Sequence, residues 1–397
     1  MKRNKTTKIN LIKSAFDKEE RTRNQLARFV KTTPFFSMNK ECKKFEENFA
    51  KKQQREYAIF FNSGSSANLA LIQAMLNLGL LKKDDPVGFS SLTWATNVMP
   101  LIQLGLNPIP IDCNLRTLNT DKEHIEKNGK KIRCLFLTNA LGFSDNLQEI
   151  SKYCKNNNIL LIEDNCESLG SQCNGTLLGN FGIASTFSFF VGHHMSTIEG
   201  GMVCTDNEEL ANMLIMVRAH GWDRNLEEKK KKKLRKINKI SPFYGVYTFY
   251  DLGFNFRPNE LNGFLGNVQL KYLDNIIEKR FKNYKFFFNM IKNSNKLISL
   301  DFSHMNVISN FAFPLIFKSE STFKKYRDLF FENGIEVRPI IAGDITRQPF
   351  FKKYLRQKSD WSLPNTAIIH RNGFYFGNNQ ELTKEERTII GNLLSDL

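Results

Sequence analysis

Short runs of strand-forming residues alternate with segments of helical periodicity from about residue 57 to residue 220. This order is typical of a mostly parallel sheet with helices on both faces, because each helix returns the chain to the edge where the next parallel strand begins. We therefore predict an α/β fold with seven strands, at Tyr57–Asn62, Val87–Ser90, Ile109–Asp112, Cys134–Thr138, Ile159–Glu163, Thr186–Phe189 and Met202–Thr205. The predicted helices between them include Ser66–Leu80, Gln148–Lys155 and Glu208–Arg218.

The sequence changes character after a long helical pattern. Residues Glu260–Phe281 are predicted to form one helix that links two parts of the chain. Beyond about residue 280 the pattern is that of a small α+β domain, with strand-like pieces at Asn310–Phe317 and Ile335–Ile340 and a helical segment at Ser321–Asn333. We predict a large domain over 1–270, which includes the N-terminal segment, and a small domain over 271–397. The crevice between them is the expected place for an active site.

Composition argues against several other classes of protein. The seven cysteines are scattered and form no C-x-x-C pair, which favours buried reduced thiols over a zinc ribbon or a redox dithiol. The basic N-terminal segment has no apolar stretch of signal-peptide length, and nowhere do about 18 apolar residues run together. We expect a cytoplasmic protein with no resident metal and no membrane partner.

Much of the formal net charge of +17 is local to one basic run, Lys229–Lys239. Because this run has no interleaved aromatic residues, a solvated loop is favoured over a patch that binds nucleic acid. No nucleic-acid partner is therefore expected. Basic charge would also suit a substrate that carries a diphosphate.

A glycine- and serine-rich turn, FNSGSSAN at Phe61–Asn68, lies directly between a predicted strand and a predicted helix. Such a turn presents backbone N–H groups and hydroxyls at the positive end of a helix, which is a ready site for phosphate. Ser65 and Ser66, beside Gly64, are the candidate ligands. A serine that only caps the helix is the alternative.

Two further segments contain side chains that suit a heteroaromatic ring. IEDNCES at Ile162–Ser168 places Asp164 at the carboxyl end of an apolar strand, where open α/β sheets bind ligands. An aspartate that faces a pyridine nitrogen keeps the ring protonated, and a protonated ring is the better electron sink. Trp94, in SLTWATN, offers a flat face for stacking. A helix-capping role for Asp164 and a core position for Trp94 are the competing interpretations.

The run Ser188–Thr205, SFFVGHHMSTIEGGMVCT, has the outline of the loop that carries the lysine of pyridoxal-phosphate enzymes. It contains no lysine, and a histidine stands where the lysine would be. An enzyme that keeps such a site without its lysine is expected to catalyse a reaction other than amino transfer.

The turn, the aromatic residue, the acidic strand end, the histidine loop and its double glycine follow one another in a distinctive order. In this order the chain resembles the DegT/DnrJ/EryC1/StrS family of sugar aminotransferases, from about residue 35 to the C-terminus. The resemblance implies the type I aspartate-aminotransferase fold. In that family a serine-phenylalanine pair precedes the catalytic lysine at a fixed interval. Counted from Ser188 and Phe189, the lysine position falls on His193.

Other motifs narrow the resemblance to the sugar 3-dehydratase branch of this family. They are EDNCESLGS, GHHMSTIEGG, FNFRPNELNGFLGNVQL, VRPIIAGDITRQPF at Val337–Phe350 and GFYFGNN at Gly373–Asn379. One type of dehydratase in this branch resembles an iron–sulfur protein, with clustered cysteines after the active-site loop. Residues Asp206–Asn310 contain no cysteine, so the type that works without a separate reductase is favoured.

The resemblance implies pyridoxal 5′-phosphate, or its pyridoxamine form, as the cofactor. Without a lysine this cofactor is expected to be held by non-covalent contacts alone. The implied contacts are Gly64, Ser65, Ser66 and Ser188 for the phosphate, Trp94 for the ring face, Asp164 for the ring nitrogen, Glu167 near the ring hydroxyl and, from a second subunit, Asn255. A homodimer with shared active sites is therefore expected.

The implied reaction removes the C3 hydroxyl of a nucleotide-linked 4-keto-6-deoxy sugar for deoxysugar biosynthesis, with glutamate as the amino donor and ammonia as a product. His193 suits it because an imidazole with a pKa near ~6.5 accepts one proton and delivers another to the leaving oxygen. Arg338 and Arg347 are candidate substrate ligands, with surface positions as the alternative. His194 is a further substrate candidate, and register favours His193 as the base. Structural roles are expected for His124, His220, His304 and His370.

Two other functions remain open at this point. A sugar aminotransferase that uses another base would form an aminated sugar and release no ammonia. A non-catalytic relative would bind the cofactor or the nucleotide sugar as a regulator, but it would have little reason to keep Asp164, the phosphate turn and a usable base together. The nucleotide (GDP, CDP or dTDP) and the sugar (hexose or heptose) stay undetermined.

Overall fold

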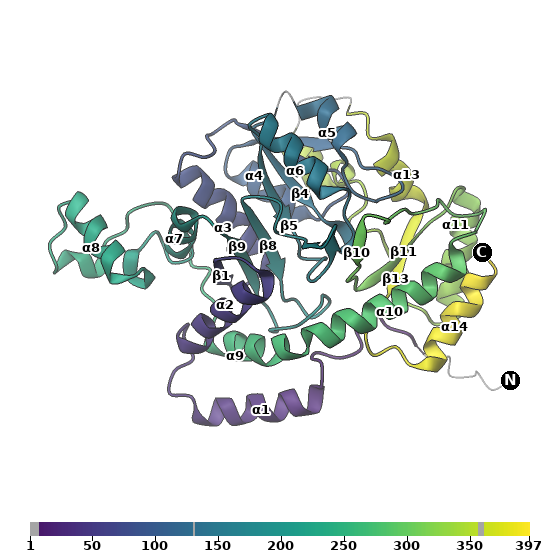
Figure 1. Cartoon of the computed structure of the whole chain (residues 1–397), viewed down its shortest axis with the longest axis horizontal. Coiled ribbons are helices and arrows are strands. Elements are labelled where there is room, and N and C mark those ends of the chain that lie inside the picture. Colours follow the sequence, from purple (N-terminus) through teal and green to yellow (C-terminus); the bar gives the residue numbers. More distant parts are fainter. Residues whose placement is uncertain (1–7, 130–131, 356–360) are drawn as a thin grey trace.

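A seven-stranded sheet lies at the centre of the molecule (Figure 1), in a computed structural model that describes residues 8–129, 132–355 and 361–397. The strand order is β1-β9-β8-β5-β4-β2-β3, and all neighbours are parallel except β9, which is antiparallel to both β1 and β8. The strands are β1 (Tyr57–Phe61), β2 (Pro86–Ser90), β3 (Asn107–Ile111), β4 (Cys134–Thr138), β5 (Leu160–Asp164), β8 (Ala184–Ser188) and β9 (Gly201–Thr205). The predicted α/β class and the seven predicted strands are confirmed.

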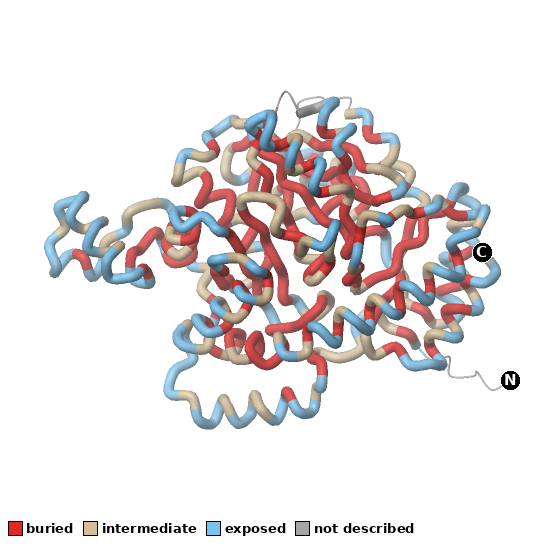
Figure 2. Tube along the Cα trace, in the orientation of Figure 1, coloured by how far each residue is buried: buried red, intermediate tan, exposed pale blue. Residues whose placement is uncertain are grey.

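Both faces of this sheet are covered by helices, which is why its central strands β4, β5 and β8 are buried along almost their whole length (Figure 2). In β4, Phe136 packs into the apolar cluster that contains α3 (Gly64–Asn77) and α7 (Glu208–Val217). Its neighbour Leu135 points to the other face, into the cluster that contains α6 (Leu147–Asn156). Further helices on the large sheet are α2 (Lys40–Gln53), α4 (Met99–Gln103) and α5 (Lys122–Gly129). All seven cysteines are free thiols; six are buried and Cys166 is partly exposed.

The predicted single helix at Glu260–Phe281 is wrong in detail. The structure has two helices, α9 (Glu260–Gln269) and α10 (Leu273–Ile291), joined by a 3₁₀ turn. The two helices have different packing partners. A Cβ atom on Gly266 of α9 would lie 2.7 Å from the Phe45 ring of α2, so the glycine permits the close contact there. Helix α10 instead packs against α14 (Lys384–Ser395) near the C-terminus.

A three-stranded antiparallel sheet follows, in the order β11-β13-β12. Its strands are β11 (Ala312–Ile316), β12 (Val337–Pro339) and β13 (Gly373–Gly377), flanked by α11 (Glu320–Glu332) and α13 (Pro364–Asn372), whereas α12 (Pro349–Tyr354) packs on the large sheet through Phe351. This is the expected small α+β part of the fold. The strands β6 (Gln172–Cys173), β7 (Thr176–Leu177) and β10 (Met305–Val307) form another small sheet that the sequence did not reveal. The proposed division at residues 270 and 271 stays a prediction.

The basic run Lys229–Lys239 is a helix and not the expected loop. Helix α8 (Glu228–Ile237) has no buried residue and projects from the body of the molecule, at the left of Figure 1. Lysine and glutamate are good helix formers, and an ion pair from Lys231 to Glu228 lies along one face. Helix α1 (Glu19–Thr32) lies at the bottom of Figure 1 and packs along α9, with the rings of Phe29 and Phe264 stacked. Within the described ranges, no helix combines the length and apolarity needed to cross a membrane. Residues 1–7 of the basic N-terminal segment lie outside the described ranges.

Candidate active site

A cavity of about 590 Å³ lies at the carboxyl edge of the large sheet, where the loops after β1, β4, β5 and β8 meet the small antiparallel sheet. This is the edge at which open α/β sheets bind ligands. Eight of the predicted site residues line it: Gly64, Ser65, Trp94, Asp164, Glu167, Ser188, His193 and Arg338. Ser66, His194, Arg347 and Asn255 do not belong to its lining.

The glycine-serine turn forms one end of the cavity at the start of α3. Ser63 caps the helix, because its Oγ accepts a hydrogen bond of 3.0 Å from Ser66 N–H. The Ser66 hydroxyl lies 2.9 Å from the same Oγ, so it is engaged within the cap and is not turned to the cavity as predicted. The positive helix end therefore faces the cavity together with Ser65 and Ser188. These are the groups that would bind a phosphate.

Position 64 has room only for a glycine, because the end of β8 lies against it. A Cβ atom added there would be 2.8 Å from Ser188 Cβ and 3.2 Å from Cys166 Sγ. The absence of a side chain lets the first turn of α3 approach two other walls of the cavity. The result is a cradle of backbone N–H groups and hydroxyls, which fits the phosphate of the cofactor implied by the sequence.

We expect Gly64→Ala to weaken cofactor binding about tenfold or more, because the methyl group must displace the cradle walls. Alanine is about 1 kcal/mol better than glycine inside a helix, so the change should not weaken the helix itself. Titration of apo protein with pyridoxamine phosphate, followed by fluorescence, measures the effect. Gly391→Ala is the matched control, because Gly391 is another buried helix glycine, lies outside the cavity lining, and its added Cβ would come close only to the flexible end of Met290, at 3.0 Å. An unchanged affinity in Gly64→Ala would contradict the cradle.

Asp164 is almost fully buried at the end of β5, and its carboxylate is fixed from three sides. Its Oδ2 accepts hydrogen bonds from the amide groups of Asn68 (2.9 Å) and Asn97 (2.7 Å), and its Oδ1 accepts one from Cys166 N–H (2.8 Å). Among the described residues no cationic side chain pairs with it. A fixed carboxylate that lines a cavity without a cationic partner fits a protonated ring nitrogen. The helix-capping alternative is therefore not needed.

Asn68 and Asn97 were missed by the sequence analysis, although both lie inside motifs that it quoted. For Asn68, the sequence signal was an amide side chain on an otherwise apolar face of the predicted helix, just after the phosphate turn. Trp94 is 56% exposed and lines the cavity, which excludes the core position. Its ring is available to cover a planar ligand.

Glu167 has one oxygen engaged by the backbone and lines the cavity. Leu141 N–H donates a 2.8 Å hydrogen bond to its Oε2. Leu141 itself has a φ of 51°, a left-handed conformation that a leucine adopts only when its surroundings impose it. Burial, and to a smaller degree the nearby Asp164 carboxylate, raise the pKa of Glu167 to about 7. The site therefore holds a carboxyl group that gains or loses a proton near neutral pH.

This shift makes stability depend on pH in a predictable direction. Because folding raises the pKa of Glu167 from 4.5 to about 7, the folded protein keeps a proton that the unfolded chain releases, and the free energy of unfolding falls as the pH rises through this interval. Glu167→Gln removes the titration, so its stability relative to wild type should increase between about pH 5 and pH 8. Urea unfolding of the apo protein measures this. Glu56→Gln, at an exposed glutamate, is the control, and parallel curves for Glu167→Gln and wild type would refute the assignment.

His193 lines the cavity on the loop after β8, between the rings of Phe190 and Phe311, with centroids 5.8 and 5.4 Å away. Its backbone N–H donates to Phe190 O at 3.0 Å. The Nδ1 atom is buried and has no hydrogen-bond partner among the described residues. Burial lowers the pKa of His193 to about 4, so the ring is neutral at pH 7. A neutral imidazole with an unused nitrogen beside a cavity is suited to accept a proton.

His194 does not reach the cavity, contrary to the expectation that it contacts substrate. It is almost fully buried, and its Nε2 lies 2.8 Å from Ser309 O. The loop backbone thus points the two rings in different directions, which supports the choice made by register. The other four histidines, His124, His220, His304 and His370, also lie outside the cavity lining.

The two candidate arginines lie in different places relative to the cavity. Arg338 lines the cavity and is paired with Glu336 at 2.5 Å, and the other carboxylate oxygen of Glu336 accepts from Leu11 N–H at 3.0 Å. This hydrogen bond attaches the N-terminal segment beside the cavity. Leu11 and Ile12 of this segment belong to the cavity lining. Arg347 is half exposed, pairs with Asp344 at 3.2 Å and does not reach the cavity, which is the surface alternative.

Asn255 is exposed, and its Oδ1 accepts from Arg257 Nε at 2.9 Å. It lies outside the cavity of its own chain. A contact between this residue and a cofactor therefore requires the cavity of another subunit.

Comparison with known proteins finds relatives that match most of the chain. The model of the DegT/DnrJ/EryC1/StrS aminotransferase family matches residues 17–394. GDP-4-keto-6-deoxy-D-mannose 3-dehydratase of Escherichia coli O55:H7 is 35% identical over 364 residues, which are 88% of this chain and 91% of the relative. A solved structure of a GDP-4-keto-6-deoxymannose-3-dehydratase variant with bound GDP-perosamine has a TM-score of 0.89 at 32% identity and covers 97% of this chain and 100% of its own. Another, with a trapped PLP–glutamate geminal diamine, has a TM-score of 0.87 at 32% identity and the same two coverages.

Proposed function

Because the chain belongs to the DegT/DnrJ/EryC1/StrS aminotransferase family, we propose that it removes the C3 hydroxyl group of a GDP-linked 4-keto-6-deoxy sugar. The chain is a pyridoxal-phosphate-dependent 3-dehydratase of nucleotide sugars, with the aminotransferase fold and glutamate as amino donor. The proposal also specifies GDP as the nucleotide of the substrate. The GDP-sugar dehydratases that match almost the whole chain support this choice. The single observation that carries the reaction is His193, a neutral base at the cavity position where an aminotransferase has its lysine.

Different side chains of the cavity would bind different parts of the cofactor. The start of α3, with the hydroxyls of Ser65 and Ser188, would bind the phosphate. Asp164 would hold the proton on the ring nitrogen, and Trp94 would cover one ring face. When bound in its amine form, pyridoxal phosphate carries the sugar and supplies the electron sink for the departure of the hydroxyl group.

The proton transfers fall to His193. Its imidazole takes up a proton from the bound cofactor and sugar, and the resulting imidazolium returns one to the departing oxygen. Because the pKa is low, the ring is unprotonated before the first transfer, and the imidazolium formed in that transfer releases its proton readily in the second. Unlike a lysine amine, an imidazole forms no stable covalent link to the cofactor aldehyde, so the cofactor stays free to carry the sugar.

The test is incubation of the purified protein with pyridoxal phosphate, glutamate and GDP-4-keto-6-deoxymannose. Release of ammonia and a sugar product that has lost the C3 oxygen are expected. An aminated sugar without free ammonia would identify an aminotransferase instead, and no turnover with cofactor bound would favour a regulatory relative. The CDP- and dTDP-linked sugars, assayed in parallel, test the nucleotide, and a higher kcat/KM with either would overturn the choice of GDP.

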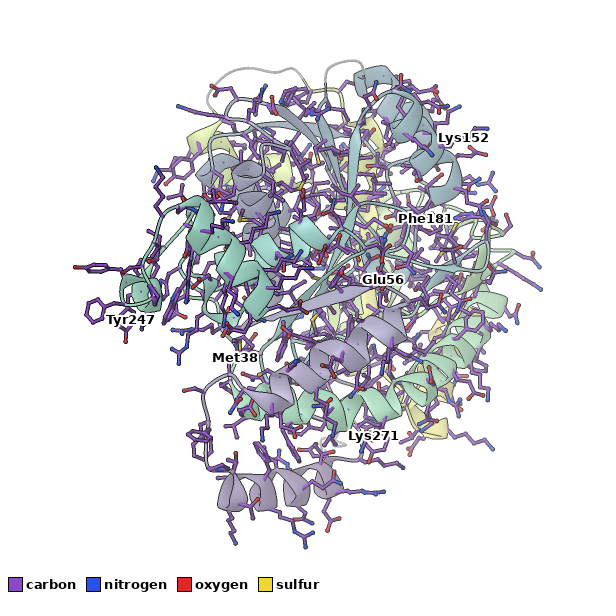
Figure 3. All side chains as sticks on the ribbon, turned by 60° about the vertical axis from the view of Figure 1, so that its left-hand side comes forward. Met38, Glu56, Lys152, Phe181, Tyr247 and Lys271 are labelled. Atoms are coloured by element: carbon purple, nitrogen blue, oxygen red, sulfur yellow. The ribbon has the colours of Figure 1, made fainter. Side chains whose placement is uncertain are left out.

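The proposal includes a homodimer in which Asn255 reaches the partner's cavity. The homodimer is supported by the segment 228–252, which contains α8 and is here called the arm. This arm exposes a group of large apolar side chains: Phe243, Tyr244, Tyr247, Phe249 and Leu252. Exposed apolar groups of this size are typical of an interface between proteins. Figure 3 labels Tyr247 at the outer end of the arm, where its ring is largely exposed and stacks on Trp222 of the same chain with the centroids 5.5 Å apart.

Subunit mixing tests the shared site. Asn255→Ala and Asp164→Asn are each expected to be nearly inactive as homodimers, because every site has a defect. If Asn255 crosses over, mixed dimers contain one site with both defects and one with neither, so activity should return after subunit exchange. The product is measured before and after mixing, and exchange is verified by native mass spectrometry. Mixed dimers without activity would contradict the shared site.

A further inference from the structure

The loop that holds His193 is fastened by a buried arginine from α10. The Nη2 atom of Arg280 donates a 2.9 Å hydrogen bond to His193 O, and the guanidinium also donates to Gln380 Oε1, at 3.1 Å from Nε and 2.9 Å from Nη2. Arg280 is 3% exposed and forms no ion pair with any described residue, and its Nη1 has no hydrogen-bond partner there. Burying a guanidinium without a carboxylate partner is costly, so the fold keeps this charge in place at some expense to stability.

The GFYFGNN motif, to which the mechanism gives no role, holds this arginine in place. After β13, the Asn378 side chain donates to Arg280 O at 2.9 Å and to Asn310 Oδ1 at 2.7 Å. The next two residues continue the contact, since Asn379 O accepts from Asn283 of α10 at 3.1 Å and Gln380 binds the guanidinium. The turn after β13 therefore binds both the backbone and the side chain of Arg280.

Charged groups from several elements act on the His193 ring. Burial has the largest effect and lowers its pKa; next, Asp164 of β5 raises the pKa, and Arg280 of α10 lowers it. Burial has the largest effect on the neighbouring His194 and lowers its pKa, and Arg280 lowers it further. The guanidinium therefore opposes the effect of the Asp164 carboxylate, which alone would stabilise an imidazolium.

We propose that Arg280 is a positioning residue for the proton transfer: it fixes the backbone of His193 through the hydrogen bond to its carbonyl oxygen, and its positive charge acts on the imidazole in opposition to the Asp164 carboxylate. Gln380 takes part because it binds the guanidinium without neutralising it. The inference rests on the proposed function only in assigning His193 as the proton acceptor.

Two variants separate the geometric role from the electrostatic one. Arg280→Met removes both the hydrogen bond to His193 O and the charge. Gln380→Glu leaves Arg280 in place but gives it a carboxylate partner, so the field at His193 weakens while the hydrogen bond remains. Arg55→Met is the control, because the buried side chain of Arg55 also binds backbone carbonyls, of Gly179 and Gly182, and lies outside the cavity, although unlike Arg280 it pairs with a carboxylate, that of Asp206.

The first readout is the titration of His193 in the protein without substrate, by NMR of protein labelled with ¹³C at histidine Cε1. His193→Asn identifies the signal. The wild-type ring should titrate near pH 4, whereas in both variants its pKa should rise by about one unit or more, the effect expected of a nearby charge. The same shift in Arg55→Met, or none in Gln380→Glu, would overturn the electrostatic role. Gln380→Glu decides this point even if Arg280→Met fails to fold.

The second readout is the pH profile of the dehydration reaction. The acid limb of kcat/KM should move to higher pH in both variants, while kcat at high pH falls about tenfold or more only in Arg280→Met, where the loop has lost its support. A wild-type kcat in folded Arg280→Met would refute the positioning role. Failure of the dehydratase assay with wild-type protein would instead refute the proposed function and leave the NMR result standing.

Discussion

Replacing His193 by asparagine is expected to lower kcat for dehydration about 10³-fold, because asparagine cannot accept a proton and general acid–base catalysis contributes about 10² to 10⁴. The amide has a similar size and lies between the same rings of Phe190 and Phe311, so the cavity should keep its shape. Formation of the 3-deoxy product under saturating glutamate and sugar measures the loss. Exchange of the methylene hydrogens of bound pyridoxamine phosphate with deuterated solvent should slow by a similar factor.

His194→Asn is the comparison that tests the register of the loop. This ring contacts Ser309 O in the interior and does not line the cavity. The substitution should therefore reduce thermal stability more than it reduces the rate of the chemical step. If product formation were lost in His194→Asn and kept in His193→Asn, the assigned base would be wrong. His193→Lys should also abolish dehydration, because a lysine amine binds the cofactor aldehyde covalently.

Asp164→Asn is expected to lower kcat about 10²- to 10³-fold, the size of effect seen when one electrostatic contact to a transition state is removed. The carboxylate faces the cavity with its charge unpaired, and a neutral amide would no longer hold a proton on the ring nitrogen. The side-chain amide would also oppose the donor groups of Asn68 and Asn97. The measurements are kcat, the affinity for pyridoxamine phosphate, and the absorbance of the bound cofactor as a function of pH.

Glu163→Gln is the matched control for this prediction. Glu163 precedes Asp164 on β5 and is equally buried, but its carboxylate accepts hydrogen bonds from Gly179, Phe181 and Gly182 N–H on the other side of the strand. Glu163→Gln should reduce stability and leave the cofactor absorbance unchanged. Equal losses of cofactor affinity in the two variants would show that Asp164 acts through folding alone.

Sequence reasoning succeeded where the physical cause is local. Strand β4 is apolar at consecutive positions because both sides of it are covered, and such a run is visible in the sequence as Cys134–Thr138. The ends of helices were harder to predict than the strands. In α3, for example, the residue that caps the helix is decided by backbone angles that the sequence does not reveal. The sequence favoured Ser66 as a ligand, whereas Ser63 caps the helix and engages the Ser66 hydroxyl. The same limit explains why α9 and α10 were predicted as one helix.

The sequence alone determined the class of fold, the order of the motifs and the position of His193, because these depend on residue type and spacing along the chain. The tertiary structure decided which side chains share the cavity. It buried His194, exposed Trp94 to the cavity, and brought Arg280, held by Gln380, from a distant segment onto the loop of His193. No local pattern encodes such contacts, because a buried arginine's partners are fixed by packing between elements that lie far apart in the sequence.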